Sequence, residues 1–203
     1  MKAAEVQVTE PAVTLALDAE GGDHAPQEIV AGALLAASPR LKVLLVGRPE
    51  VIEPHLRGEA AAYVDVVPSV SVIGSGQEPA AAVRGMPDSS IVVGARLVHE
   101  GRARGFISAG STGAMLAASL LVVKRVPGIR RPAILTTLPG LHGPVLFLDA
   151  GANADCRAEH LLEFAVLGTA YARAVLGHAH PRVGLLNIGE EPSKGDELAL
   201  AAH

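Results

Sequence analysis

The chain has 203 residues, enough for one sizeable domain or two small ones with a buried core. Apolar residues make up 49% of it and aromatic residues only 2%, so the core must consist of Ala, Val, Leu and Ile, as in parallel strands buried on both faces. A formal net charge of −4 gives no basic footprint for nucleic acid, and the single cysteine, Cys156, excludes an internal disulfide framework and fits a reducing compartment.

The N-terminal residues 1–12 are predicted to be a flexible extension, because they carry charges and no apolar stretch of the kind a signal peptide needs. The longest uncharged apolar run, residues 114–123, is about half as long as a membrane span. The cytoplasm is therefore the expected compartment.

Apolar runs typical of strands alternate with helical patterns along most of the chain. Strands are predicted at 13–17, 43–46, 63–67, 105–108, 134–138, 145–148 and 182–188. Helices are predicted at 26–37, 50–56, 90–100, 112–124 and 158–176. Residues 68–88, rich in Gly and Pro, are expected to form an irregular functional or mobile loop.

Repeated strand–loop–helix units with short connections predict a mostly parallel sheet covered by helices. Residues 195–203 look like a helix that has just begun. We therefore expect one α/β domain over residues 13–203, cut short at its C-terminal end.

Four glycine-containing loops follow predicted strands, and open parallel sheets bind ligands at the carboxyl ends of their strands. We therefore expect these loops to converge. They comprise residues 18–24, 108–114, 149–155 and 187–195.

The loop at 108–114 has the strongest anion-binding character. Gly110 and Gly113 let backbone N–H groups approach an oxyanion, Ser111 and Thr112 add hydroxyl donors, and a helix N-terminus follows. The pattern matches neither a Walker loop nor G-x-G-x-x-G. An ordinary strand-to-helix turn with a Ser or Thr cap is the alternative.

The loop at 18–24 brings together Asp18, Asp23 and His24, and a histidine beside carboxylates can act as an acid or base near neutral pH. Alternatively, Asp23 caps the following helix and His24 is simply solvated.

The other two loops are rich in charged and amide side chains. Asp149, Asn153 and Asp155 form either a cation- or hydroxyl-binding cluster or plain turn chemistry. Glu191 and Lys194, with Glu190, are either catalytic or a surface charge cluster. Cys156 directly follows the acidic residue Asp155, and we expect it to be structural.

Residues 124–131 contain four cations, Lys124, Arg125, Arg130 and Arg131, and form the one local basic stretch. In a chain of net negative charge this stretch is suited to steering an acidic partner. A solubilising helix end is the alternative, since cations are favoured at helix C-termini.

Taken in order, these segments resemble the acyl-carrier-protein:phosphate acyltransferase family. The similar stretches are Leu-Asp-Ala-x-Gly-Gly-Asp-His-Ala-Pro at 17–26, Ser-Ala-Gly-x-Thr-Gly-Ala at 108–114, Asp-x-Gly-Ala-Asn at 149–153 and Asn-Ile-Gly-Glu-Glu at 187–191. The match runs from about residue 13 to residue 200. Glu20 stands where Met is expected and Ser111 where Asn is usual, so these loops differ in detail from the family pattern.

The resemblance implies a Rossmann-like three-layer α/β/α fold of the isopropylmalate-dehydrogenase type and a homodimer. It implies transfer of a fatty acyl group from acyl carrier protein to inorganic phosphate, with no metal or organic cofactor. The acyl phosphate product would serve a membrane-bound glycerol-3-phosphate acyltransferase, and peripheral association with the membrane is consistent with that partnership.

In such an enzyme we expect His24, Asn153 and Lys194 to be catalytic. Lys124, Arg125, Arg130 and Arg131 are expected to contact the carrier protein. The expected substrate-binding residues are Asp18, Gly21, Gly22, Asp23, Gly110, Ser111, Thr112, Gly113, Asp149, Gly151, Asn187, Gly189 and Glu190. Two other functions fit the same loops: a phosphotransacetylase-like acyl exchange with acyl-CoA, and a phosphate- or partner-binding fragment without turnover.

Overall fold

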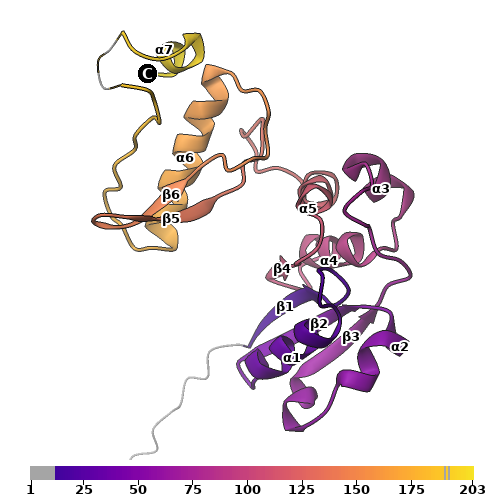
Figure 1. Ribbon diagram of the computed structural model, residues 1–203. Coiled ribbons are helices and arrows are strands. Elements are labelled where there is room, and N and C mark those ends of the chain that lie inside the picture. The colour runs from indigo at the N-terminus through magenta and orange to yellow at the C-terminus, as the bar shows by residue number, and fades with distance from the viewer. Residues whose placement is uncertain (1–11, 190, 192) are drawn as a thin grey trace, which may run out of the picture. The chain divides into compact units, whose positions relative to one another are not determined.

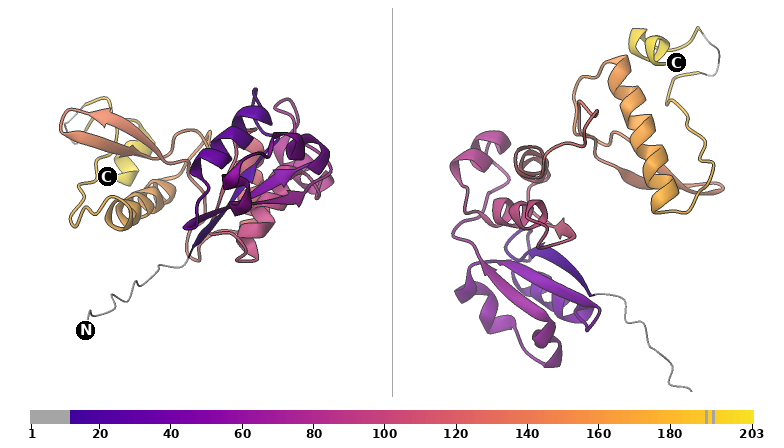
Figure 2. Two further views of the ribbon diagram at one scale, coloured as in Figure 1. Left: turned by 90° about the horizontal axis from the view of Figure 1, so that it is seen from below. Right: turned by 180° about the vertical axis from the view of Figure 1, so that it is seen from behind.

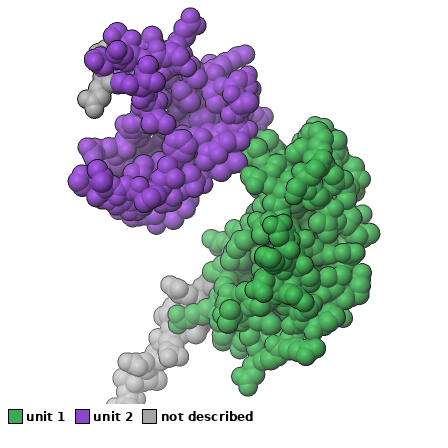
Figure 3. Space-filling model, in the orientation of Figure 1, with its two compact units in different colours: residues 1–124 green, residues 125–203 purple. Residues whose placement is uncertain are grey.

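The computed structural model describes residues 12–189, 191 and 193–203. They form two compact units that divide between Lys124 and Arg125 (Figure 3). Apart from residue 12, the predicted N-terminal extension lies outside the described residues. Within the described part of the chain, no helix combines the length and the apolar character that crossing a membrane requires.

A four-stranded parallel sheet forms the centre of the first unit (Figure 1). Its strands lie in the order β3-β2-β1-β4, so β1 has neighbours on both sides. The strands are β1 (Val13–Asp18), β2 (Leu41–Gly47), β3 (Val64–Pro68) and β4 (Gly105–Ile107). The helices are α1 (Gln27–Ala36), α2 (Pro49–Ile52), α3 (Pro79–Gly85), α4 (Ser90–His99) and α5 (Thr112–Ala118), which continues as a π-helical turn over Ser119–Val123.

Alternate residues of β2 are buried on opposite faces of the sheet, as the two-residue period of a strand requires. Leu45 packs in one cluster with Val30 of α1, whereas Val46 packs in another with Leu97 of α4. Helices therefore cover both faces, which explains the uninterrupted apolar run 43–46 in the central part of β2. The predicted three-layer α/β/α fold with a mostly parallel sheet is confirmed.

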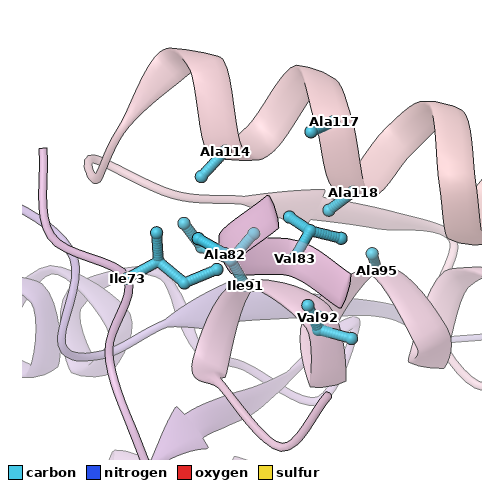
Figure 4. Packing of buried hydrophobic residues seen from close by; sticks show 9 residues of the cluster. All are labelled: Ile73, Ala82, Val83, Ile91, Val92, Ala95, Ala114, Ala117 and Ala118. Carbon is cyan, nitrogen blue, oxygen red and sulfur yellow. The ribbon is translucent and has the colours of Figure 1, made fainter. Parts of the chain in front are cut away.

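A third apolar cluster joins α3, α4 and α5 beside the sheet (Figure 4). Small side chains let these helices approach one another closely, which suits a chain almost without aromatic residues. The cluster consists of Ile73, Ala82, Val83, Ile91, Val92, Ala95, Ala114, Ala117 and Ala118.

The second unit contains an antiparallel hairpin and two helices, and Figures 1 and 2 show α6 beside the hairpin. Among the described residues of the second unit, the buried apolar side chains are Phe164 and Ala172 of α6. Its elements are β5 (Thr136–Gly140), β6 (Gly143–Phe147), α6 (Ala158–Ala174) and α7 (Glu197–Ala202).

Three predictions about individual elements are wrong. Residues 182–188 form no strand, because they pair with no other strand in the described chain, and the side chain of Leu186 is 81% exposed. The segments at 134–138 and 145–148 contribute to the antiparallel hairpin and not to a parallel sheet. Part of the expected irregular stretch at 68–88 is α3, which begins with Pro79 after the capping side chain of Glu78.

Candidate functional site

The strand order places the best candidate site between β1 and β4. From β1 the chain continues to β2 and β3, which lie on one side of β1 within the sheet. β4 lies on the other side of β1. Such a reversal of strand order opens a crevice at the carboxyl ends of the strands, where α/β proteins bind ligands. The loops that leave the sheet at this crevice are 18–24 and 108–114, two of the four loops that the sequence singles out.

A buried carboxylate joins these two loops. Asp18 is fully buried at the end of β1, and its Oδ2 accepts a hydrogen bond of 2.7 Å from the Ser108 hydroxyl after β4. The Ser108 Oγ in turn accepts a hydrogen bond of 3.0 Å from the backbone N–H of Gly110. Asp18 therefore sets the position of the glycine loop that follows β4.

Gly21 lies where the two loops touch. A Cβ atom on this residue would lie 2.9 Å from the backbone nitrogen of Gly110 and 2.9 Å from Ser108 Oγ, besides clashing with the Asp18 carboxylate. Next to it, Gly22 has a φ of +103°, in the region that glycine favours. Only glycine at both positions permits this close approach of the two backbones.

The N-terminal turn of α5 follows the glycine loop after β4. The Ser111 hydroxyl caps the helix by accepting a hydrogen bond of 3.3 Å from the backbone N–H of Ala114. The first backbone N–H groups of a helix have no acceptor within the helix, and those of Thr112 and Gly113 belong to this set. Ser111 thus caps the helix, as the alternative of an ordinary strand-to-helix turn predicts, and the N–H groups of Thr112 and Gly113 remain as donors for an anion.

Neither Asp23 nor His24 takes part in the Asp18 network. Both side chains are exposed, and among the described residues no hydrogen bond joins them to Asp18. The backbone carbonyl of His24 accepts from the N–H of Glu28 at the start of α1. The His24 imidazole is exposed on the loop after β1, and a catalytic role for it stays a prediction.

In the second unit, Asp149 organises its own loop. Its carboxylate accepts backbone hydrogen bonds from Ile134 at 2.7 Å, Ala152 at 3.0 Å and Asn153 at 2.8 Å, and a longer one of 3.3 Å from Gly151. Burial raises the pKa of Asp149, but these hydrogen bonds and that of the Asn153 amide together lower the pKa below its usual value.

Asn153 has hydrogen-bond partners for both ends of its side chain. Its Nδ2 donates to the carbonyl of Pro132 at 2.8 Å and to Asp149 at 3.0 Å, and its Oδ1 accepts from Arg131 at 3.4 Å. Cys156 nearby is partly buried, and burial followed by the charge of Asp149 raises the pKa of its thiol. A raised pKa fits the structural role expected for this cysteine.

The basic stretch is largely engaged in internal contacts. Arg130 forms ion pairs with Glu159 at 2.8 Å and Glu163 at 3.5 Å, and the Arg125 guanidinium donates to the backbone carbonyl of Arg130. Lys124 is exposed with a φ of +76° at the end of the π-helical turn. Contact of these residues with an acidic carrier stays a prediction.

The fourth loop closes on itself through Asn187. Its Nδ2 donates to the carbonyl of Lys194 at 2.9 Å, while its Oδ1 accepts from the N–H of Ile188 at 2.9 Å. A Cβ on Gly189 would lie 2.9 Å from Lys194 Cγ, so these residues are neighbours. Glu190 lies outside the described residues. The convergence of all four loops at one site also stays a prediction, since loops 149–155 and 187–195 belong to the second unit.

Two features of the carboxyl edge were missed in the sequence. Glu20 pairs with Arg48, which follows β2, and opposite charges directly after neighbouring parallel strands were a usable signal. The Glu20 hydrogen bond and charge raise the pKa of Arg48. Furthermore, the hydroxyls of Ser69, Ser89 and Ser90 are buried without a hydrogen-bond partner in the structure as described. Within the described ranges, no cluster of three His, Cys, Asp or Glu side chains could hold a metal ion.

Comparison with known proteins bears on the identity of the chain. A family model described as fatty acid synthesis protein matches residues 13–203. Among similar proteins, the phosphate acyltransferase of Heliobacterium modesticaldum is 54% identical over 93% of this chain and 58% of its own length. The phosphate acyltransferase of Gloeobacter violaceus is 50% identical over 96% of this chain and 58% of its own length.

The chain thus spans a little over half the length of these relatives. Among solved structures, the EutD phosphotransacetylase from Staphylococcus aureus has a TM-score of 0.56 at 20% identity, over 79% of this chain and 53% of that one, which shows a shared fold. Since the family model matches nearly all the described residues and the relatives match at 50% identity or more, the chain belongs to the fatty acid synthesis protein family of phosphate acyltransferases.

Proposed function

We propose that the protein transfers a fatty acyl group from acyl carrier protein to inorganic phosphate and so produces acyl phosphate for phospholipid synthesis. One structural observation carries this proposal: the glycine loop 108–113 meets loop 18–22 at the point where the strand order reverses. The relatives are named phosphate acyltransferase, and this name supports the transfer of an acyl group to phosphate.

The reaction needs few side chains. A phosphate oxygen attacks the thioester carbonyl carbon, the bond between carbon and sulfur breaks, and the carrier thiolate leaves and takes up a proton. Phosphate is already anionic at neutral pH and a thiolate leaves readily. The protein must therefore orient phosphate and stabilise the negative charge on the carbonyl oxygen, which backbone N–H groups and cations do well.

In this mechanism the loop from Gly110 to Gly113 holds phosphate through N–H groups such as those of Thr112 and Gly113, while the N–H of Gly110 stays on Ser108 Oγ. His24 handles the proton, Lys194 neutralises developing charge, and Asn153 contributes through the loop that it shares with Asp149. Asp18 positions the loop after β4 and does not bind phosphate. Its carboxylate is buried and hydrogen-bonded to Ser108, and its negative charge would repel an anion.

The wider setting is part of the same proposal. The acidic carrier protein binds to the basic stretch, through Lys124, Arg125, Arg130 and Arg131. The active form is a homodimer in the cytoplasm. The acyl phosphate product passes to a membrane-bound glycerol-3-phosphate acyltransferase. The cation-rich stretch in a chain of net negative charge supports contact with an acidic carrier, and the lone cysteine supports a reducing compartment.

The test is to incubate the protein with an acyl carrier protein thioester and phosphate and to trap acyl phosphate with hydroxylamine. A mixture without phosphate corrects for direct attack of hydroxylamine on the thioester. Phosphate-dependent product supports the proposal, and a preference for acyl-CoA as donor would support exchange of the phosphotransacetylase kind. If this chain forms no acyl phosphate while a full-length relative does so under the same conditions, the chain binds phosphate or a partner without turnover.

Substitution at Gly110 tests the phosphate loop itself. A Cβ there would lie 3.1 Å from Ser108 Oγ and 3.4 Å from the Cα of Gly21, so Gly110→Val must displace the loop. We expect the phosphate concentration for half-maximal rate to rise at least about tenfold. Gly32→Val on α1, where a Cβ meets nothing within 4 Å, is the matched control. An unchanged phosphate requirement in Gly110→Val would remove this loop from the site.

A further inference from the structure

Glu20 and Arg48 form a buried-to-surface ion pair at the carboxyl edge of the sheet. The Glu20 side chain is 5% exposed and that of Arg48 46% exposed, and Nη2 of Arg48 lies 2.6 Å from Oε1 of Glu20. Arg48 Nε donates to the same oxygen at 2.8 Å, while the backbone N–H of Arg48 donates to Oε2 at 2.8 Å. Both oxygens of this carboxylate are therefore satisfied by one residue.

The surroundings of the pair are built to hold it. Arg48 is the residue between β2 and α2, so its backbone is fixed by two elements. Gly47 before it leaves room for Glu20, since a Cβ at position 47 would lie 3.1 Å from Glu20 Cγ. A planar guanidinium that binds one carboxylate through two nitrogens restrains both distance and angle.

The restraint acts on the residue next to Gly21. The Glu20 backbone N–H donates to Asp18 Oδ1 at 3.2 Å, so residue 20 is held through its backbone by Asp18 and through its side chain by Arg48. Gly21 follows directly and contacts the backbone nitrogen of Gly110. Any change in the position of residue 20 is thus transmitted to the glycine loop after β4.

We propose that Glu20 and Arg48 are positioning residues, which hold Gly21 against Gly110 and so keep the loop 110–113 in the geometry that binds phosphate. This inference rests on the proposed function, in which that loop is the phosphate site. A pair that only stabilised the fold would change the melting temperature and leave the affinity for phosphate unaltered.

The experiment is a titration of the protein with inorganic phosphate, followed by the NMR shifts of the Gly110 and Gly113 amides. The variants are Arg48→Ala and Glu20→Gln, and thermal unfolding of each is measured in parallel. Arg102→Ala is the matched control, because it removes an exposed ion pair of 3.8 Å with Glu100 at the amino end of β4.

In Arg48→Ala we expect the dissociation constant for phosphate to rise about tenfold, because residue 20 loses both charge-assisted contacts with the Arg48 guanidinium. Glu20→Gln keeps the size and one acceptor of the side chain, so we expect a smaller rise of about threefold. This variant also keeps the test available if Arg48→Ala does not fold. Arg102→Ala should bind phosphate as the unmodified protein does.

Two negative results have different meanings. If the unmodified protein binds phosphate and both variants bind it equally well, the positioning role is wrong and the proposed phosphate site stands. If the unmodified protein shows no phosphate-dependent shift at these amides, the proposed phosphate site is wrong, and the positioning role is wrong with it.

Discussion

The tripeptide Leu-Asp-Ala occurs twice, at 17–19 and at 148–150, and the two aspartates do different work. Asp18 is fully buried and binds the hydroxyl of Ser108, the residue that follows β4. Asp149 is partly exposed and binds backbone N–H groups, three of which belong to the four residues that follow it. The same local sequence therefore serves as a tie between strands in one unit and as the organiser of a turn in the other.

The difference comes from the neighbours of each strand. β1 lies between two parallel strands, so the residue at its end faces the end of β4. β6 pairs only with β5 in the described sheet, and Asp149 after it binds its own loop and the N–H of Ile134, which lies just before β5. A motif of three residues defines a polar group at a strand end, but the strand order determines what that group contacts.

The largest effect is expected for Asp18→Ala. Loss of the buried carboxylate leaves the Ser108 hydroxyl without its acceptor and a space at the end of β1, which should lower the free energy of unfolding by about 3 kcal/mol. Denaturant unfolding followed by circular dichroism measures this. Asp65→Ala, on the exposed side of β3, is the control and should stay within about 0.5 kcal/mol. Equal losses in the two variants would contradict the tie between strands.

The next largest effect is expected for Gly21→Ala, which should lower the free energy of unfolding by about 2 kcal/mol. The added Cβ displaces either Ser108 or the backbone of Gly110. Gly151 makes an instructive partner in the second loop. Its φ is +127° but nothing lies within 4 Å of an added Cβ, so Gly151→Ala introduces backbone strain without a clash. We expect Gly21→Ala to perturb the amide resonances of Gly110, and Gly151→Ala to perturb only residues of its own loop.

Asp149→Ala should lower the free energy of unfolding by about 1 kcal/mol, which is typical for the loss of a side chain that caps backbone N–H groups. Hydrogen exchange should show the loss as faster exchange of the amides of Ala152 and Asn153, with the parallel sheet unaffected. Asp155→Ala, an exposed aspartate of the same loop, should leave exchange at these amides unchanged. Faster exchange throughout the first unit would show that Asp149 has a wider role.

The smallest effect is a dependence on pH. The pKa of Asp149 is lower in the folded protein than in the unfolded chain, so its contribution is complete above the usual carboxyl pKa of about 4. The contribution disappears as the pH falls through the lower, folded value. The stability difference between the unmodified protein and Asp149→Asn should therefore shrink below about pH 4. A difference that stays constant down to pH 2 would contradict this account.

The parallel layers of the first unit could be predicted because their signal is local. The stretch 43–46 of β2 is a continuous apolar run, and the helices between the strands show their own periodicity. The strands at 134–138 and 145–148 are predicted too, but not their pairing as an antiparallel hairpin. Parallel neighbours need a crossover of about a dozen residues, and only six separate 138 from 145. Loop length was the usable signal there.

Residues 182–188 show where local preference fails. The run Val-Gly-Leu-Leu-Asn-Ile favours a strand, but a strand also needs a partner for its backbone groups, and the described chain supplies none. The link between Asp18 and Ser108 could not be derived either, because it depends on β4 lying next to β1. Strand order arises from the packing of the whole sheet and is not encoded at either loop.

The division of the chain at residue 124 has a practical consequence for spectroscopy. The protein contains no tryptophan and two tyrosines, Tyr63 in the first unit and Tyr171 on α6 in the second. Each unit thus carries one intrinsic fluorophore. In a Tyr171→Phe protein, emission on excitation at the tyrosine band reports the first unit alone, and Tyr63→Phe isolates the second, so the two melting curves can be recorded without any attached label.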